Sequence, residues 1–109
     1  MREIDVTALR SELDREQDGP NPAVVDVRER HEFAAGHVPG AVNVPLTEFV
    51  DRVTEVTILP GDVYVICESG ARSAQVTAWL GQQGHDVVNV AGGTGSWRAA
   101  GYPVESPVG

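Results

Sequence analysis

The sequence contains one cysteine, Cys67, among its 109 residues. A single thiol cannot form a disulfide within the chain, and a free thiol is typical of a reducing compartment. The N-terminal residues, Met1 to Val6, lack the apolar core of a signal peptide. We therefore expect a cytoplasmic protein with a free thiol.

Basic residues are also scarce. The chain has 8 Lys and Arg residues against 16 Asp and Glu residues, which gives a formal net charge of −8. Nucleic acids and anionic membrane surfaces are both bound by clustered basic side chains, so neither is an expected partner. A small anionic substrate would depend on local cations and on backbone N–H groups.

Long apolar runs and metal-binding patterns are missing as well. No stretch approaches the length of a membrane span. The three histidines form no ligand pattern with cysteine or carboxylate, so we expect neither a metal nor another cofactor. No repeat, linker or low-complexity segment divides the chain, and residues 1–109 are expected to form a single domain.

Short β-branched runs alternate with segments of helical periodicity along the whole chain. Strands are predicted at 4–6, 23–27, 42–44, 63–66 and 87–90. Helices are predicted at 7–16, 30–35, 47–53 and 73–83 and around Trp97, with Thr7 and Thr47 as N-caps. This alternation predicts an α/β fold, a parallel sheet with helices on both faces.

Cys67 lies at the carboxyl end of a predicted strand, where parallel α/β sheets bind their ligands. The loop that leads from it into the next helix consists of Glu68, Ser69, Gly70, Ala71, Arg72 and Ser73. Gly70 permits a positive φ, so the N–H groups of the loop can converge on the sulfur together with the positive end of the helix. Ser73 is expected to cap the helix and to donate its hydroxyl to the sulfur, and Arg72 supplies a cation. These features favour the nucleophilic thiolate; the alternative is an ordinary buried core cysteine.

Four segments, in this order, resemble signatures of the rhodanese family of sulfurtransferases. They are 24–29, 32–45, 67–73 and 92–104. The resemblance covers nearly the whole chain and implies a five-stranded parallel sheet with a persulfide carried on Cys67. Asp26 and Arg28 are expected to form a structural pair that braces the loops near the site. His37 is expected to hydrogen-bond to the backbone at a turn.

The resemblance also implies a two-step exchange. The Cys67 thiolate would take sulfur from a small donor such as thiosulfate or a persulfide, and pass it to cyanide, a thiol or a partner protein. The alternatives are a rhodanese-fold binding module, a redox sensor and a cysteine phosphatase. Related phosphatases place arginine six positions after the cysteine, whereas Arg72 follows Cys67 by five, which predicts a pocket fitted to a single sulfur atom.

Glu68 departs from the family pattern, because many active members resemble one another in having a basic residue directly after the cysteine. An acidic side chain at the mouth of the site would repel a small anion. We therefore expect weak activity with thiosulfate, increased by Glu68→Arg.

Overall fold

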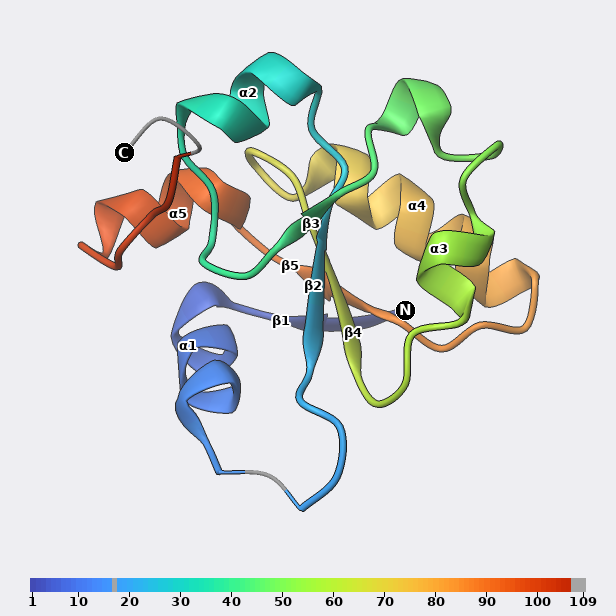
Figure 1. The fold of residues 1–109 in the computed structure, drawn as a ribbon, viewed down its shortest axis with the longest axis horizontal. Coiled ribbons are helices and arrows are strands. Elements are labelled where there is room, and N and C mark those ends of the chain that lie inside the picture. The colour runs from blue at the N-terminus through green and yellow to red at the C-terminus, as the bar shows by residue number, and fades with distance from the viewer. Residues whose placement is uncertain (17, 107–109) are drawn as a thin grey trace.

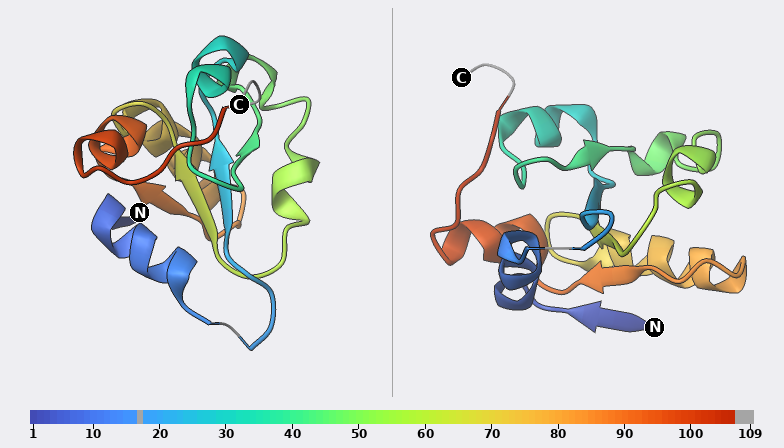
Figure 2. Two further views of the ribbon diagram at one scale, coloured as in Figure 1. Left: turned by 60° about the vertical axis from the view of Figure 1, so that its left-hand side comes forward. Right: turned by 60° about the horizontal axis from the view of Figure 1, so that its bottom comes forward.

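A computed structural model describes residues 1–16 and 18–106, and it contains one five-stranded sheet (Figure 1). All strand pairs are parallel, and the strand order is β1-β5-β4-β2-β3. The strands are β1 (Arg2–Ile4), β2 (Ala23–Asp26), β3 (Val42–Asn43), β4 (Val63–Ile66) and β5 (Val88–Val90). Strands β1 and β3 form opposite edges of the sheet (Figure 2).

Helices cover both faces of the sheet, which confirms the predicted fold class. The helices are α1 (Val6–Asp14), α2 (Arg30–Ala35), α3 (Thr54–Thr57), α4 (Ala71–Gln82) and α5 (Gly93–Ala99), with a 3₁₀ turn η1 (Leu46–Glu48). Helices α1 and α5 lie on one side of the central strands and α3 and α4 on the other, while α2 lies above the carboxyl ends of β2 and β4 (Figure 1). None of these helices is long and apolar enough to cross a membrane, in residues 1–16 and 18–106.

The core consists of two apolar clusters, one on each face of the sheet. Alternate residues of β4 enter different clusters, because successive side chains of a strand point to opposite faces. Val63 and Val65 pack with residues of α3 and α4, and Tyr64 and Ile66 pack with residues of α1 and α5. Cys67 continues this alternation and belongs to the cluster under α4.

The N-terminal elements begin earlier than predicted. The first strand is Arg2–Ile4 rather than 4–6, and α1 starts at Val6. Asp5, not Thr7, is the N-cap, since its carboxylate accepts the Ala8 N–H at 2.8 Å. Aspartate is a stronger N-cap than threonine, and it ends the strand one residue before the helix.

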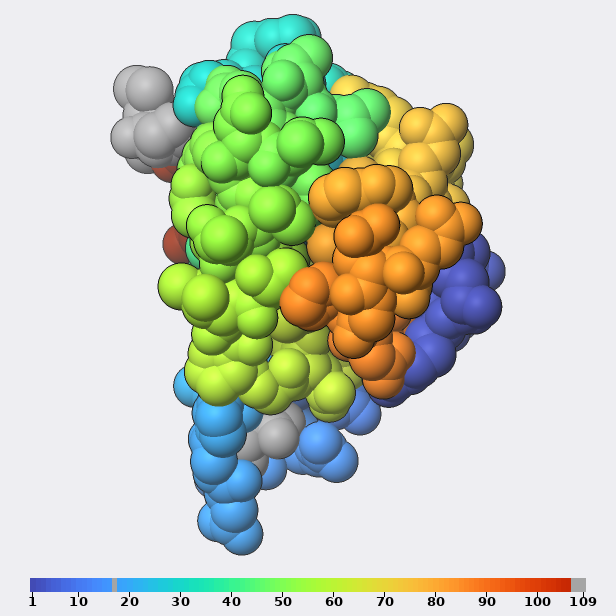
Figure 3. All heavy atoms as spheres, turned by 90° about the vertical axis from the view of Figure 1, so that its right-hand side faces the viewer, coloured from blue at the N-terminus to red at the C-terminus, as the bar shows by residue number. Residues whose placement is uncertain are grey.

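The predicted helix over 47–53 was wrong. The segment forms η1, a run of turns, and then the short helix α3, which lies beside the end of α4 on the face shown in Figure 3. Thr47 does not cap a helix, because its hydroxyl donates to Glu29 Oε1 at 2.8 Å. The segment is rich in valine and threonine, whose branched side chains lower helix propensity.

Candidate active site

The sulfur of Cys67 is held by donors from the loop between β4 and α4. The Gly70 N–H donates to Sγ at 3.1 Å, and the Ser73 hydroxyl lies 3.4 Å from it. Gly70 has a φ of 98°, in the left-handed region that glycine adopts without strain. A Cβ there would meet Gly92 N at 3.1 Å and Val90 O at 3.3 Å. The predicted loop geometry therefore depends on a glycine at this position.

Helix α4 begins at Ala71, two residues before the predicted cap. Gly70 occupies the N-cap position, and the expectation that Ser73 caps the helix was wrong. The side chain of Ser73 lies inside the first turn, fully buried, where it is turned toward the sulfur. The second expectation for Ser73, donation to Sγ, agrees with this geometry.

The pKa of the Cys67 thiol lies below its ordinary value. Burial raises this pKa, because the charged form is the more strongly hydrated one. The opposing hydrogen bonds outweigh burial: they come from the Ser73 hydroxyl and from the N–H groups of Ser73, Gly70 and Ser69. The loop thus favours a thiolate, the form that acts as a nucleophile.

Removing the Ser73 hydroxyl is expected to raise the pKa of Cys67. One hydrogen bond to the sulfur contributes ~1 kcal/mol, so Ser73→Ala should slow alkylation of Cys67 by iodoacetamide about fivefold near pH 7. The measurement is the alkylation rate as a function of pH. Ser69→Ala is the matched control, because it deletes an exposed hydroxyl from the same loop and keeps the N–H group. Equal rate profiles for the two variants would contradict the conclusion that the Ser73 hydroxyl lowers the pKa of Cys67.

Arg72 forms an ion pair with α2. Its Nη1 and Nη2 atoms donate to the two carboxylate oxygens of Glu32, both at 2.8 Å. The Arg72 hydrogen bond lowers the pKa of Glu32 to about 2, so the pair stays charged well into acid. Nothing in the local sequence indicates this partner, which lies 40 residues away.

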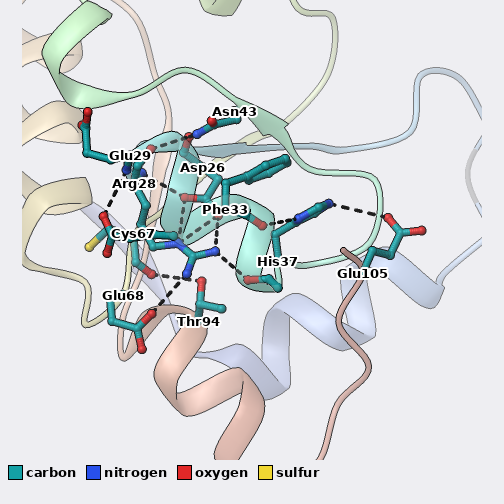
Figure 4. Close-up of polar contacts among 12 residues, drawn as sticks. Asp26, Arg28, Glu29, Phe33, His37, Asn43, Cys67, Glu68, Thr94 and Glu105 are labelled. Atoms are coloured by element: carbon teal, nitrogen blue, oxygen red, sulfur yellow. Dashed lines mark hydrogen bonds and ion pairs between the residues drawn. The ribbon is translucent and has the colours of Figure 1, made fainter. Parts of the chain in front are cut away.

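Asp26 and Arg28 form the expected buried pair at the end of β2 (Figure 4). Asp26 is 0% and Arg28 1% exposed, and Arg28 Nη2 lies 2.9 Å from Asp26 Oδ2. The same guanidinium donates to Gly36 O at 2.8 Å and to Glu68 Oε1 at 3.2 Å. Arg28 therefore connects three segments at the carboxyl end of the sheet.

Glu68 is paired with two arginines. Besides Arg28, it accepts a hydrogen bond from Arg98 Nη1 of α5 at 2.9 Å. The carboxylate and Arg98 are partly exposed, whereas Arg28 is buried. The weak thiosulfate activity expected from the sequence stays a prediction, but the two guanidiniums offset the charge on which it depended.

His37 makes the backbone hydrogen bond expected from the sequence. Its Nδ1 atom lies 2.8 Å from Phe33 O, and its ring stacks on the Phe33 ring with 3.6 Å between centroids. Its backbone pairs with Glu105, so this turn holds the C-terminal segment against α2 (Figure 4). These contacts of His37 thus connect α2 to the C-terminal segment.

The first turn of α5 also contacts the loop, and sequence reasoning missed it. Thr94 is fully buried, and its N–H and hydroxyl donate to the carbonyl oxygen of Cys67 at 2.8 and 3.2 Å. The Gly95 N–H donates to Glu68 O at 2.9 Å. The adjacent glycines 92 and 93 were the one local signal of a close backbone approach.

Comparisons with known proteins agree with the fold. Residues 9–100 match the rhodanese-like domain family. The chain is 36% identical to a sulfurtransferase of Allochromatium vinosum, with 100% of this chain and 99% of the relative covered. It is 38% identical to the thiosulfate sulfurtransferase GlpE of Pseudomonas putida GB-1, with 87% and 84% covered.

A solved structure gives the same result. The crystal structure of a rhodanese-related protein from Thermoplasma volcanium superposes with a TM-score of 0.83 at 31% identity, covering 96% of this chain and 98% of the other. The family match spans the first three segments that carry the sequence resemblance and the fourth as far as residue 100. The chain belongs to the rhodanese-like family.

Proposed function

We propose that the protein is a sulfurtransferase that carries sulfane sulfur as a persulfide on Cys67. The observation that supports this most directly is the sulfur itself, which accepts hydrogen bonds from Gly70 N–H and the Ser73 hydroxyl. A persulfide ion needs the same donors as a thiolate, so one loop can stabilise the anion in both half-reactions. The names of the related sulfurtransferases are consistent with this chemistry.

The first half-reaction loads the cysteine. The Cys67 thiolate attacks the outer sulfur of a donor RS–SH or of thiosulfate. A new S–S bond forms, the old bond breaks, and the leaving thiolate or sulfite departs with the electron pair. The outer sulfur remains on Cys67 as a persulfide, and the cysteine needs no outside oxidant or reductant.

The second half-reaction unloads it. A thiolate or cyanide attacks the outer sulfur, and the Cys67 thiolate leaves with the electron pair and returns to its starting state. This is covalent catalysis with ping-pong kinetics. The acceptor is a small thiol or the thiol of a partner protein in this proposal, and cyanide serves as the assay acceptor.

Intact-mass measurement tests the proposal. The reduced protein is exposed separately to thiosulfate, to a small persulfide and to peroxide, and then to cyanide. We expect a mass gain of one sulfur atom on Cys67 with at least one sulfur donor, removed by cyanide. A gain of oxygen alone would favour a redox sensor, and no gain with any sulfur donor would favour a binding module.

The phosphatase alternative has little support in the site. Arg72 follows Cys67 by five positions, and its guanidinium is engaged by both carboxylate oxygens of Glu32. A phosphatase would require this pair to open and the arginine to rotate inward. Hydrolysis of an aryl phosphate at a rate comparable to sulfur transfer would overturn the proposed function.

A further inference from the structure

We propose that Thr94 is a positioning residue for the Cys67 thiolate, acting through the backbone of the loop rather than by touching the sulfur. This inference depends on the proposed role of Cys67 as the nucleophile. Thr94 is the second residue of α5, and both of its hydrogen bonds to the loop go to a backbone oxygen. Thr94 lies within the segment 92–104, but the sequence assigned no role to its hydroxyl.

Thr94 donates two hydrogen bonds to the same atom, the carbonyl oxygen of Cys67. Both its N–H (2.8 Å) and its Oγ1 (3.2 Å) donate to the carbonyl oxygen of Cys67, and the side chain is fully buried. Figure 4 shows Thr94 beneath the Cys67 backbone, beside Arg28 and Glu68. The residue next to it, Gly95, donates its N–H to the carbonyl oxygen of Glu68 at 2.9 Å. Two successive loop carbonyls are therefore anchored by the same turn.

Anchoring the carbonyls orients the N–H groups. In a trans peptide the C=O and the N–H point in opposite directions. The peptide that gives Glu68 O to Gly95 also carries the Ser69 N–H, which is one of the groups that lower the pKa of Cys67. The peptide that gives Cys67 O to Thr94 fixes the backbone from which the thiol side chain itself extends. The first turn of α5 thus holds the peptide that carries the Ser69 N–H and the carbonyl group of Cys67 itself, and through both it orients the loop around the sulfur.

Gly93 makes this contact possible. Its φ is +59°, and a Cβ at this position would lie 2.4 Å from Cys67 O and 2.6 Å from Glu68 O. Both are backbone atoms, so the loop and not a side chain would have to move. The glycine lets α5 approach the loop closely enough for Thr94 and Gly95 to bond to it.

The test compares Thr94→Val with Thr94→Ser in the full chain. Valine removes the hydroxyl with little change in volume, and serine restores it. We expect Thr94→Val to slow alkylation of Cys67 near pH 7 about threefold, to shift the midpoint of the pH profile upward, and to lower kcat while KM changes little. Thr94→Ser should recover most of each effect. Arg72, the charged side chain coupled electrostatically to Cys67, is unchanged in both variants.

Leu9→Ala is the control for stability. Leu9 of α1 is also fully buried, but it packs in the apolar cluster on the face of the sheet opposite to the cluster that contains Cys67. We expect it to lower the melting temperature without moving the pH profile. If Thr94→Val lowers the melting temperature in the same way and leaves the pH profile unchanged, Thr94 is structural only and the inference is wrong.

Gly93→Ala gives a second, independent measurement. Displacement of both carbonyls should slow alkylation more than Thr94→Val does, because two peptides rather than one bond are disturbed. A folded Gly93→Ala variant with wild-type alkylation would contradict the inference. Alkylation does not require a sulfur donor, so these results stand even if no donor loads Cys67 and the proposed function fails.

Discussion

Cys67→Ser is expected to reduce sulfur transfer from any donor to cyanide at least about 10³-fold, the scale seen when a covalent nucleophile is removed. A serine hydroxyl stays protonated at neutral pH, and an oxygen at this position cannot form the persulfide. The rate of thiocyanate formation from thiosulfate, or from a small persulfide where thiosulfate is poor, measures the effect. Intact mass after donor exposure should show no added sulfur.

The variant is expected to remain folded, which makes the loss interpretable. Serine differs from cysteine by one atom, and its hydroxyl can accept the hydrogen bonds that Gly70 and Ser73 now make to the sulfur. The melting temperature should therefore fall little compared with the loss of activity. Transfer at the wild-type rate by a folded Cys67→Ser protein would show that sulfur does not pass through Cys67.

In the wild-type protein, the rate at which Cys67 is loaded with sulfur is expected to depend on the pKa of its thiol. Because the loop lowers this pKa, the thiolate is present at lower pH than in a free thiol, and the rate of loading should rise and then level off as the pH passes through it. The same donors that lower the pKa are those that Ser73→Ala and Thr94→Val disturb. The pH profiles of the wild type, of Ser73→Ala and of Thr94→Val therefore all test whether the loop stabilises the Cys67 thiolate.

The sequence predicted the centre of the molecule better than its edges. The run from 63 to 66 is short, β-branched and followed by a glycine-containing loop, and this pattern is specific to a buried strand that leads into a helix. Its strand, its loop and Cys67 lie where they were predicted. In the segments outside this centre, neighbouring residues have similar preferences for cap, helix and turn positions. Asp5 rather than Thr7 is the N-cap of α1, and the segment from 47 to 53 is not one helix.

The charged partners could not be predicted, since they depend on long-range geometry. Arg72 and Glu32 are 40 positions apart, and Glu68 and Arg98 are 30 apart. Nothing in either local sequence specifies these pairs; the sheet order brings the ends of β2, β4 and β5 together, and the pairs follow. Thr94 was missed for the same reason, because its partner is the backbone carbonyl of Cys67, which lies 27 positions away in the loop after β4.

Asp26→Ala is expected to destabilise the protein by about 3 kcal/mol, the lower end of the cost of breaking a buried ion pair, because Arg28 keeps its ion pair with Glu68. Arg28 is 1% exposed and cannot rotate into water. Asp26 accepts hydrogen bonds from the Nε, the Nη2 and the backbone N–H of Arg28, and Asp26→Ala removes all three. Denaturant unfolding measures the free energy directly. Asp14→Ala is the control, because it removes an exposed ion pair with Arg10 that contributes under about 0.5 kcal/mol.

The double variant Asp26→Leu with Arg28→Met separates charge from packing. If the cost of Asp26→Ala arises from an unpaired buried charge, removing both charges should recover much of the lost stability, as apolar replacements of buried ion pairs often do. Recovery should be incomplete here, because Arg28 also donates to Gly36 O and to Glu68, the residue beside Cys67. The double variant is therefore expected to fold but to transfer sulfur more slowly than the wild type. A double variant that is both as stable and as active as the wild type would mean that the pair does not brace the loop around the nucleophile.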